Sequence, residues 1–105
     1  MAVINIPPDN KIYKLGNIQS QLHIYNTNNP AAPNTLYNLT IPNVGNWMNV
    51  NILPGHTDTY APAGNAVYIQ NQGPSRLQVL YVDTALTPEE AGLEVVGAMP
   101  EPSES

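Results

Sequence analysis

Short segments that alternate apolar and polar residues recur along this chain at intervals of roughly ten residues. In residues 36–41 (LYNLTI), for example, Tyr37, Leu39 and Ile41 share one side of an extended backbone. Because successive side chains of a β-strand point to opposite faces, this period of two predicts half-buried strands. Eleven prolines and seven glycines interrupt the pattern and leave little room for long helices. The sequence therefore predicts an all-β domain.

The predicted strands are short and numerous, which is typical of a β-sandwich or a jelly-roll-like barrel with about six to eight strands. In residues 47–53, the alternation places Met48, Val50 and Ile52 toward the core. We expect strands at residues 3–6, 12–15, 19–26, 36–41, 47–53, 57–60, 66–71 and 76–83.

The last of these segments, residues 76–83, is apolar on both faces. Leu77 and Val79 lie on one side, while Leu80 and Val82 lie on the other. A strand that is apolar all round is buried on both faces. This segment therefore predicts a central strand, or a strand half covered by another subunit.

The two ends of the chain differ from its body. Residues 1–8 begin with an apolar stretch that two prolines end, which predicts an edge strand or an extended N-terminal arm. Residues 9–83 form the predicted sandwich domain. Within the acidic C-terminal segment, residues 84–105, the sequence TPEE at 87–90 has the form of a helix N-cap. We expect a short helical turn there, up to about Leu93, and an extended tail after it.

Acidic charge is concentrated at the C-terminal end of the chain. The formal net charge is −5, and all five glutamates follow residue 88. Residues 1–88 carry three basic and three acidic side chains, which are Lys11, Lys14, Arg76, Asp9, Asp58 and Asp83. A neutral body has no field that attracts phosphate groups, so we expect no nucleic-acid partner.

The sequence contains no apolar run as long as a bilayer-spanning helix needs, so we expect no membrane partner. The first residues lack a basic region followed by a long apolar run, and we expect no signal peptide. The absence of cysteine favours an intracellular or virion origin over secretion.

His56 and Asp58 form the sharpest local pattern for metal or catalytic chemistry. Two residues apart on a strand, they would share a face and could hold a metal ion. The pattern resembles the first motif of the cupins, which are jelly-roll metal enzymes. However, Asp58 stands where that motif has its second histidine, and no glutamate or histidine occurs from Thr59 to Thr87.

Other catalytic patterns are absent from the sequence as well. It shows no activated serine, no paired carboxylates and no glycine-rich phosphate loop. We therefore expect no catalytic, metal-binding or cofactor-binding residue, and interpret the protein as a non-enzyme. A small β-barrel enzyme centred on His56 and Asp58 remains the alternative.

Aromatic residues offer a second possible site. Exposed aromatic rings stack on sugar rings, and asparagine side chains satisfy sugar hydroxyls. A carbohydrate-binding module that uses Trp47, Tyr37 and Tyr60 is therefore an alternative function. The competing interpretation is that Trp47 covers one end of the core while the tyrosines pack within the sheets.

Residues 49–83 (NVNILPGHTDTYAPAGNAVYIQNQGPSRLQVLYVD) resemble small β-sandwich accessory proteins of tailed-bacteriophage virions. The features that carry the resemblance are a Pro54-Gly55 turn, which fits type II, a strand at 67–71, a Gly73-Pro74-Ser75 turn and a long apolar strand at 77–82. The resemblance implies a capsid decoration (cement) protein of the phage head, made in the host cytoplasm. A head-fibre or tail component is a less favoured possibility.

Such a protein would bind the major capsid protein or other virion subunits and would form a homo-oligomer, a trimer or a dimer. An uncharged polar surface and two distinctive chain ends suit a protein surrounded by neighbours. We expect residues 1–8 and 84–99 to bridge capsid subunits, and removal of residues 1–8 to leave the sandwich folded. The candidate partner-binding residues are Val3, Ile4, Ile6, Leu80, Val82, Leu93, Val95 and Val96.

Overall fold

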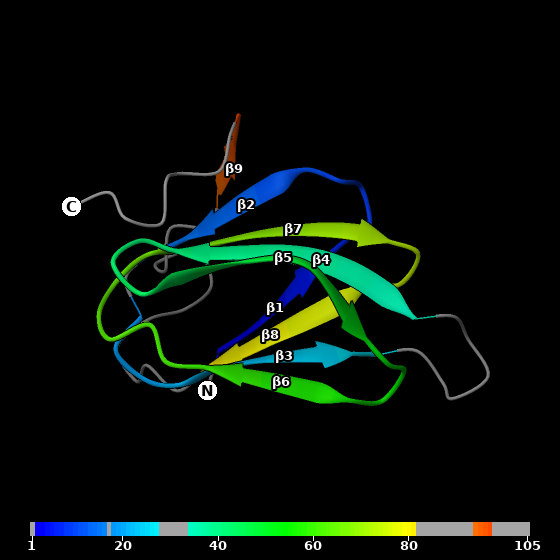
Figure 1. Cartoon of the computed structure of the whole chain (residues 1–105), viewed down its shortest axis with the longest axis horizontal. Coiled ribbons are helices and arrows are strands. Elements are labelled where there is room, and N and C mark those ends of the chain that lie inside the picture. Colours follow the sequence, from blue (N-terminus) through cyan, green and yellow to red (C-terminus); the bar gives the residue numbers. More distant parts are fainter. Residues whose placement is uncertain (1, 17, 28–33, 82–93, 98–105) are drawn as a thin grey trace.

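The chain folds into two antiparallel β-sheets that face each other (Figure 1), and the all-β sandwich prediction is confirmed. The computed structural model describes residues 2–16, 18–27, 34–81 and 94–97, and these residues contain strands but no helix. The four-stranded sheet has the order β1-β8-β3-β6, and the five-stranded sheet has the order β5-β4-β7-β2-β9. The strands are β1 (Ala2–Ile6), β2 (Ile12–Leu15), β3 (Leu22–Asn26), β4 (Thr35–Ile41), β5 (Gly45–Ile52), β6 (Thr57–Tyr60), β7 (Val67–Gly73), β8 (Leu77–Tyr81) and β9 (Glu94–Val96).

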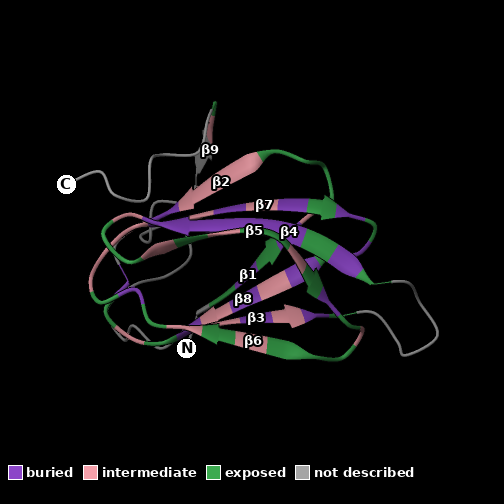
Figure 2. Cartoon of the chain, in the orientation of Figure 1, coloured by how far each residue is buried: buried purple, intermediate pink, exposed green. Residues whose placement is uncertain are grey.

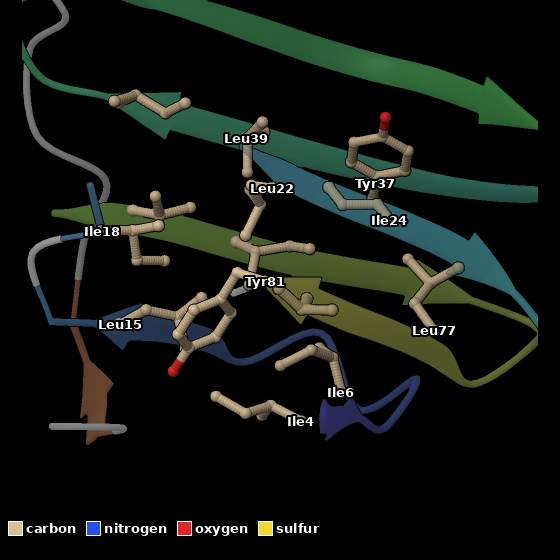
Figure 3. Packing of buried hydrophobic residues seen from close by; sticks show 14 of the residues in the cluster. Ile4, Ile6, Leu15, Ile18, Leu22, Ile24, Tyr37, Leu39, Leu77 and Tyr81 are labelled. Atoms are coloured by element: carbon tan, nitrogen blue, oxygen red, sulfur yellow. The ribbon is translucent and has the colours of Figure 1, made fainter. Parts of the chain in front are cut away.

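One apolar core fills the space between the sheets (Figure 3). Alternate residues of β1, β3, β4, β7 and β8 supply it, as the period of two predicts, and Figure 2 shows buried residues concentrated on the middle strands. The buried apolar residues include Ile4, Ile6, Leu15, Ile18, Leu22, Ile24, Tyr37, Leu39, Ile41, Ile52, Val67, Ile69, Leu77, Val79 and Tyr81.

Strand β8 lies between β1 and β3, which confirms the prediction of a central strand. The turn before it, Gly73-Pro74-Ser75, carries the chain from the five-stranded sheet into the four-stranded one. The Pro54-Gly55 turn is also confirmed. Its Gly55 has a φ of 78°, and the His56 N–H donates to the Leu53 carbonyl at 3.1 Å, as a type II turn requires.

The inward position predicted for Met48 is wrong, because β5 contains a bulge. Tyr37 pairs with Val50 and Leu39 pairs with Trp47, so β5 takes three residue steps where β4 takes two. The extra residue resets the alternation. Trp47 therefore faces the core, while Met48 is 51% exposed.

Most of the predicted N-terminal arm, residues 2–6, is strand β1 and not a free arm. Strand β1 pairs with β8 over its whole length, and Ile4 and Ile6 are only 3% and 0% exposed within the core. The edge-strand interpretation is correct and the arm interpretation is wrong, because both isoleucines are needed to fill the space beside β8. For the same reason, removal of these residues would not leave the sandwich intact.

The C-terminal segment also contributes to the sandwich. Strand β9 pairs with β2, so the sheet extends beyond the boundary predicted at residue 83. The helical turn predicted for residues 87–93 and the extended tail after residue 97 lie outside the described residues.

Candidate functional site

A cluster of three aromatic side chains and one carboxylate closes one side of the sandwich. The Tyr37 hydroxyl donates to Asp58 Oδ2 at 2.6 Å and lies 2.5 Å from the Tyr60 hydroxyl. The ring centroids of Trp47 and Tyr60 are 4.8 Å apart, with the planes at 65° in an edge-on contact. Tyr37 is fully buried, whereas the other three side chains are partly exposed. We call these four residues the aromatic cluster.

Strand register brings the aromatic cluster together from both sheets. On β6, Asp58 and Tyr60 lie opposite Ile24 and Leu22, whose side chains are in the core, so both face inward. Trp47 belongs to β5, which is one of the two edge strands of the other sheet. Its ring lies over Gly45, where a Cβ atom would come within 2.8 Å of the Trp47 ring. A side chain at position 45 would displace that ring.

The hydroxyls of the aromatic cluster form an ordered chain. A phenol has one proton, and Tyr37 gives its proton to Asp58. The Tyr60 hydroxyl is therefore the donor to Tyr37. Burial, together with the hydrogen bond to Asp58, raises the pKa of Tyr37 far above its ordinary value, and burial also raises the pKa of Tyr60. Both phenols stay neutral at physiological pH and hold the two sheets together.

The His56–Asp58 pattern does not form a joint site in this fold. His56 is exposed in the turn before β6, while the Asp58 carboxylate accepts the bond from Tyr37. Among the described residues, no three histidine, cysteine, aspartate or glutamate side chains are grouped as a metal ion would require.

A second feature is a network of side-chain amides on the outer face of the five-stranded sheet. Asn38 Nδ2 donates to Gln70 Oε1 at 2.8 Å, and Asn38 Oδ1 accepts from the Asn49 backbone N–H at 2.7 Å. Gln72 Nε2 donates to Asn49 Oδ1 at 3.1 Å, and Gln70 Nε2 donates to the Asn10 carbonyl at 2.9 Å. We call Asn38, Asn49, Gln70 and Gln72 the amide network.

The amide network gives this face a fixed and uncharged surface. It spans β4, β5 and β7, and Asn38 is only 6% exposed although it points away from the core. Two apolar side chains accompany it: Leu36 of β4 is 38% exposed, and Met48 stands in the β5 bulge. Because the amides already bond to one another, their positions are set before any partner arrives.

The predicted partner-binding residues fall into three groups. Val3 is exposed, and Leu80 and Val96 are partly exposed, so these three are accessible. Ile4 and Ile6 belong to the core and are not accessible. Val82 and Leu93 lie outside the described residues, as does the side chain of Val95.

Sequence reasoning grouped Trp47, Tyr37 and Tyr60 as glycan contacts, and the structure places the three side by side. It missed Asp58 as their partner. The shared face of Asp58 and Tyr60, two residues apart on one strand, was a usable signal. The amide network had no such signal, since its members are far apart in sequence and look like ordinary polar positions.

Comparisons with protein-family models, with curated proteins and with solved structures find no match to this chain. Within the described part of the chain, no helix is long and apolar enough to cross a membrane.

Proposed function

We propose that this protein is a structural subunit of a tailed-phage virion, a capsid decoration (cement) protein that bridges capsid subunits. The observation that carries the proposal is the amide network, a pre-ordered and uncharged polar surface on the outer face of the five-stranded sheet.

Interface physics supports this role for the amide face. The centres of protein interfaces are depleted in charged residues, and apolar anchors there carry much of the binding free energy. Leu36 and Met48 are exposed apolar side chains beside the amides. Side chains that are already bonded lose little further conformational entropy on binding. The amide face is thus suited to binding a protein partner through many individually weak contacts.

The resemblance to decoration proteins supports the same role. Its two turns and two strands occur in the fold at the expected places, as the Pro54-Gly55 turn, β7, the Gly73-Pro74-Ser75 turn and β8. Because Ile4 and Ile6 are buried, the proposed capsid contact moves from the N-terminal residues to the amide face.

The test is cosedimentation of the purified protein with capsids assembled without it. The double variant Leu36→Lys, Gln72→Lys places two charges on the amide face and should reduce capsid binding at least tenfold. The matched control Thr57→Lys, Thr59→Lys adds the same charge to the outer face of β6 and should bind as the original does. Circular dichroism checks that both variants are folded.

Equal binding by the first variant and the control would overturn the role of the amide face. Absence of the protein from purified virions, as measured by mass spectrometry, would overturn the virion role itself. Antibody labelling in electron micrographs separates a head position from a fibre or tail position.

A second candidate function is carbohydrate binding by the aromatic cluster. The observation that favours it is the convergence of Trp47, Tyr37 and Tyr60, with the Asp58 carboxylate beside them. Only Trp47 and Tyr60 present exposed ring surface for stacking. A glycan array that shows no signal for the original protein removes this candidate, whereas a signal lost in a folded Trp47→Ala variant supports it.

A further inference from the structure

The two sheets end in four edge strands, β1 and β6 in one sheet and β5 and β9 in the other. An edge strand presents unpaired backbone N–H and C=O groups to any other extended chain. Stable monomers protect such edges with bulges, inward-pointing charges, prolines or very short strands. The four edges of this sandwich differ in how far they are protected.

Three of the edges carry a recognisable protection. Strand β5 has a bulge, with Asn49 at a φ of 53°. Strand β6 is four residues long and points the Asp58 carboxylate inward. Strand β9 is three residues long. These three edges are poor templates for another strand.

Strand β1 carries none of these protections. Its five residues, AVINI, include no charge and no proline, and its pairing with β8 is regular from Ala2 to Ile6. Its other side pairs with none of the described residues. On the outer face of the sheet it presents Val3, which is 42% exposed, and the exposed Asn5.

We propose that β1 is a homodimer edge: two copies of this chain pair through β1, antiparallel, across a twofold axis. The pairing joins two four-stranded sheets into one continuous sheet of both copies. This dimer proposal does not depend on the proposed capsid role, because dimerisation and capsid binding are measured by different assays.

The chemistry of β1 favours a second copy as its partner. Across a twofold axis the strand meets itself, so any charge in it would face a like charge or break the symmetry. An uncharged strand avoids this repulsion. Pro7 and Pro8 follow directly and limit the pairing to this segment.

The alternation of faces restricts the register of such a pair. Residues opposite each other must point to the same face of the sheet. With Ile4 opposite the partner copy's own Ile4, the inward-facing Ile4 and Ile6 stay on the core side of the joined sheet. Val3 then lies opposite Asn5 of the other copy on the outer face. All five residues of β1 are paired in this register.

A pairing of five residues per copy is short for a permanent interface. We therefore expect a reversible dimer whose population rises with protein concentration. Sedimentation velocity over a concentration series should show a monomer–dimer equilibrium. A sedimentation profile that stays monomeric at every concentration would overturn the proposal.

Paired charge variants test the register. The double variant Val3→Lys, Asn5→Lys places an ammonium group opposite another at two symmetric positions and should weaken the dimer about tenfold. The double variant Val3→Lys, Asn5→Glu places opposite charges at the same two positions and should keep the original affinity. Within each copy, positions 3 and 5 lie directly opposite the uncharged Leu80 and Gln78 of β8.

The matched control is Thr57→Lys, Thr59→Lys, which adds two charges on the β6 edge and should leave the dimer unchanged. Thermal melting at low concentration checks that all variants are folded. Loss of dimer in the control as well, or equal dimer in all variants, would overturn pairing through β1. Equal loss in both variants of positions 3 and 5 would overturn the register and with it the proposal.

Discussion

Tyr37 has one hydroxyl that serves two neighbours across the gap between the sheets. Its replacement in Tyr37→Phe removes the bond to Asp58 and the bond from Tyr60. We expect the free energy of unfolding to fall by about 1–3 kcal/mol, because a partly buried carboxylate and a phenol lose their partner. Urea denaturation measures this. Tyr25→Phe, on the outer face of β3, is the control and should change stability by less than about 0.5 kcal/mol.

Tyr37 should also make the stability of the fold depend on pH. Burial raises the pKa of Tyr37 far above its ordinary value of 10.0, so the folded protein keeps this proton after the unfolded chain has lost it. The contribution is therefore complete below pH 10 and is lost as the pH rises above it, by up to about 1.4 kcal/mol per pH unit. Thermal melting from pH 8 to pH 11.5 should show this decline, and Tyr37→Phe should flatten it.

Tyr13 provides a comparison for Tyr37 in the melting experiment at alkaline pH. The hydrogen bond to Asp9 raises the pKa of Tyr13 to about 12, and this pair lies near the surface rather than between the sheets. Because water screens the interactions of an exposed pair, Tyr13→Phe should flatten the decline less than Tyr37→Phe does. An equal or larger effect of Tyr13→Phe would show that the aromatic cluster does not control alkaline stability.

For single residues, the sequence predicts which face of a strand a side chain occupies better than it predicts which residues that side chain contacts. The spacing of Asp58 and Tyr60 already places both on one face of a strand. That Tyr37 meets them depends on β4 and β6 lying in opposite sheets, which no local pattern encodes. The aromatic residues therefore look dispersed in the sequence and are neighbours in the fold.

Strand β5 depends on a residue that tolerates a left-handed backbone. Asn49 has a φ of 53° in the bulge, a conformation that costs other residues with a Cβ atom about 1–2 kcal/mol. Asn49→Ala should lower the free energy of unfolding by about that amount, whereas Asn49→Gly should stay within about 0.5 kcal/mol of the original. Asn51→Ala, on the same strand outside the bulge, controls for loss of an exposed amide. Equal losses in the alanine and glycine variants would contradict a strained backbone.

Strand β1 is a structural part of the sandwich, and its two faces should respond differently to mutation. Ile6 is fully buried, so Ile6→Ala should lower the free energy of unfolding by about 2–5 kcal/mol. Val3 is exposed, and Val3→Ala at low protein concentration should cost less than about 1 kcal/mol. Urea denaturation of both variants distinguishes a strand from an arm, since an arm would tolerate both changes.

Element positions follow from the sequence where the alternation is uninterrupted. In strands β3, β4, β7 and β8, the residues buried in the core include the apolar ones that repeat every second position. Met48 was misplaced because the bulge adds one residue that the apolar pattern does not reveal. The order of strands in the two sheets depends on long-range pairing and is equally absent from the local pattern.

Across the whole molecule, the acidic charge is concentrated near the C-terminal end of the sequence, whereas the amide network carries no charge. Among the described residues before 82, the charged side chains are those of Asp9, Asp58, Lys11, Lys14 and Arg76. The five glutamates all follow residue 88. Two routes to a partner are therefore physically distinct: contact through the uncharged amide face, and attraction through the glutamates.

The salt dependence of capsid binding distinguishes contact through the amide face from attraction through the glutamates. Screening weakens attraction between exposed charges, because the Debye length falls to about 3 Å at 1 M salt. Contacts between amides and apolar side chains are affected little. If the amide face binds the capsid, the affinity measured by cosedimentation should change less than about threefold between 50 mM and 500 mM NaCl. A loss of tenfold or more would place the contact on the glutamates, and replacing all five with glutamine should then abolish binding at low salt.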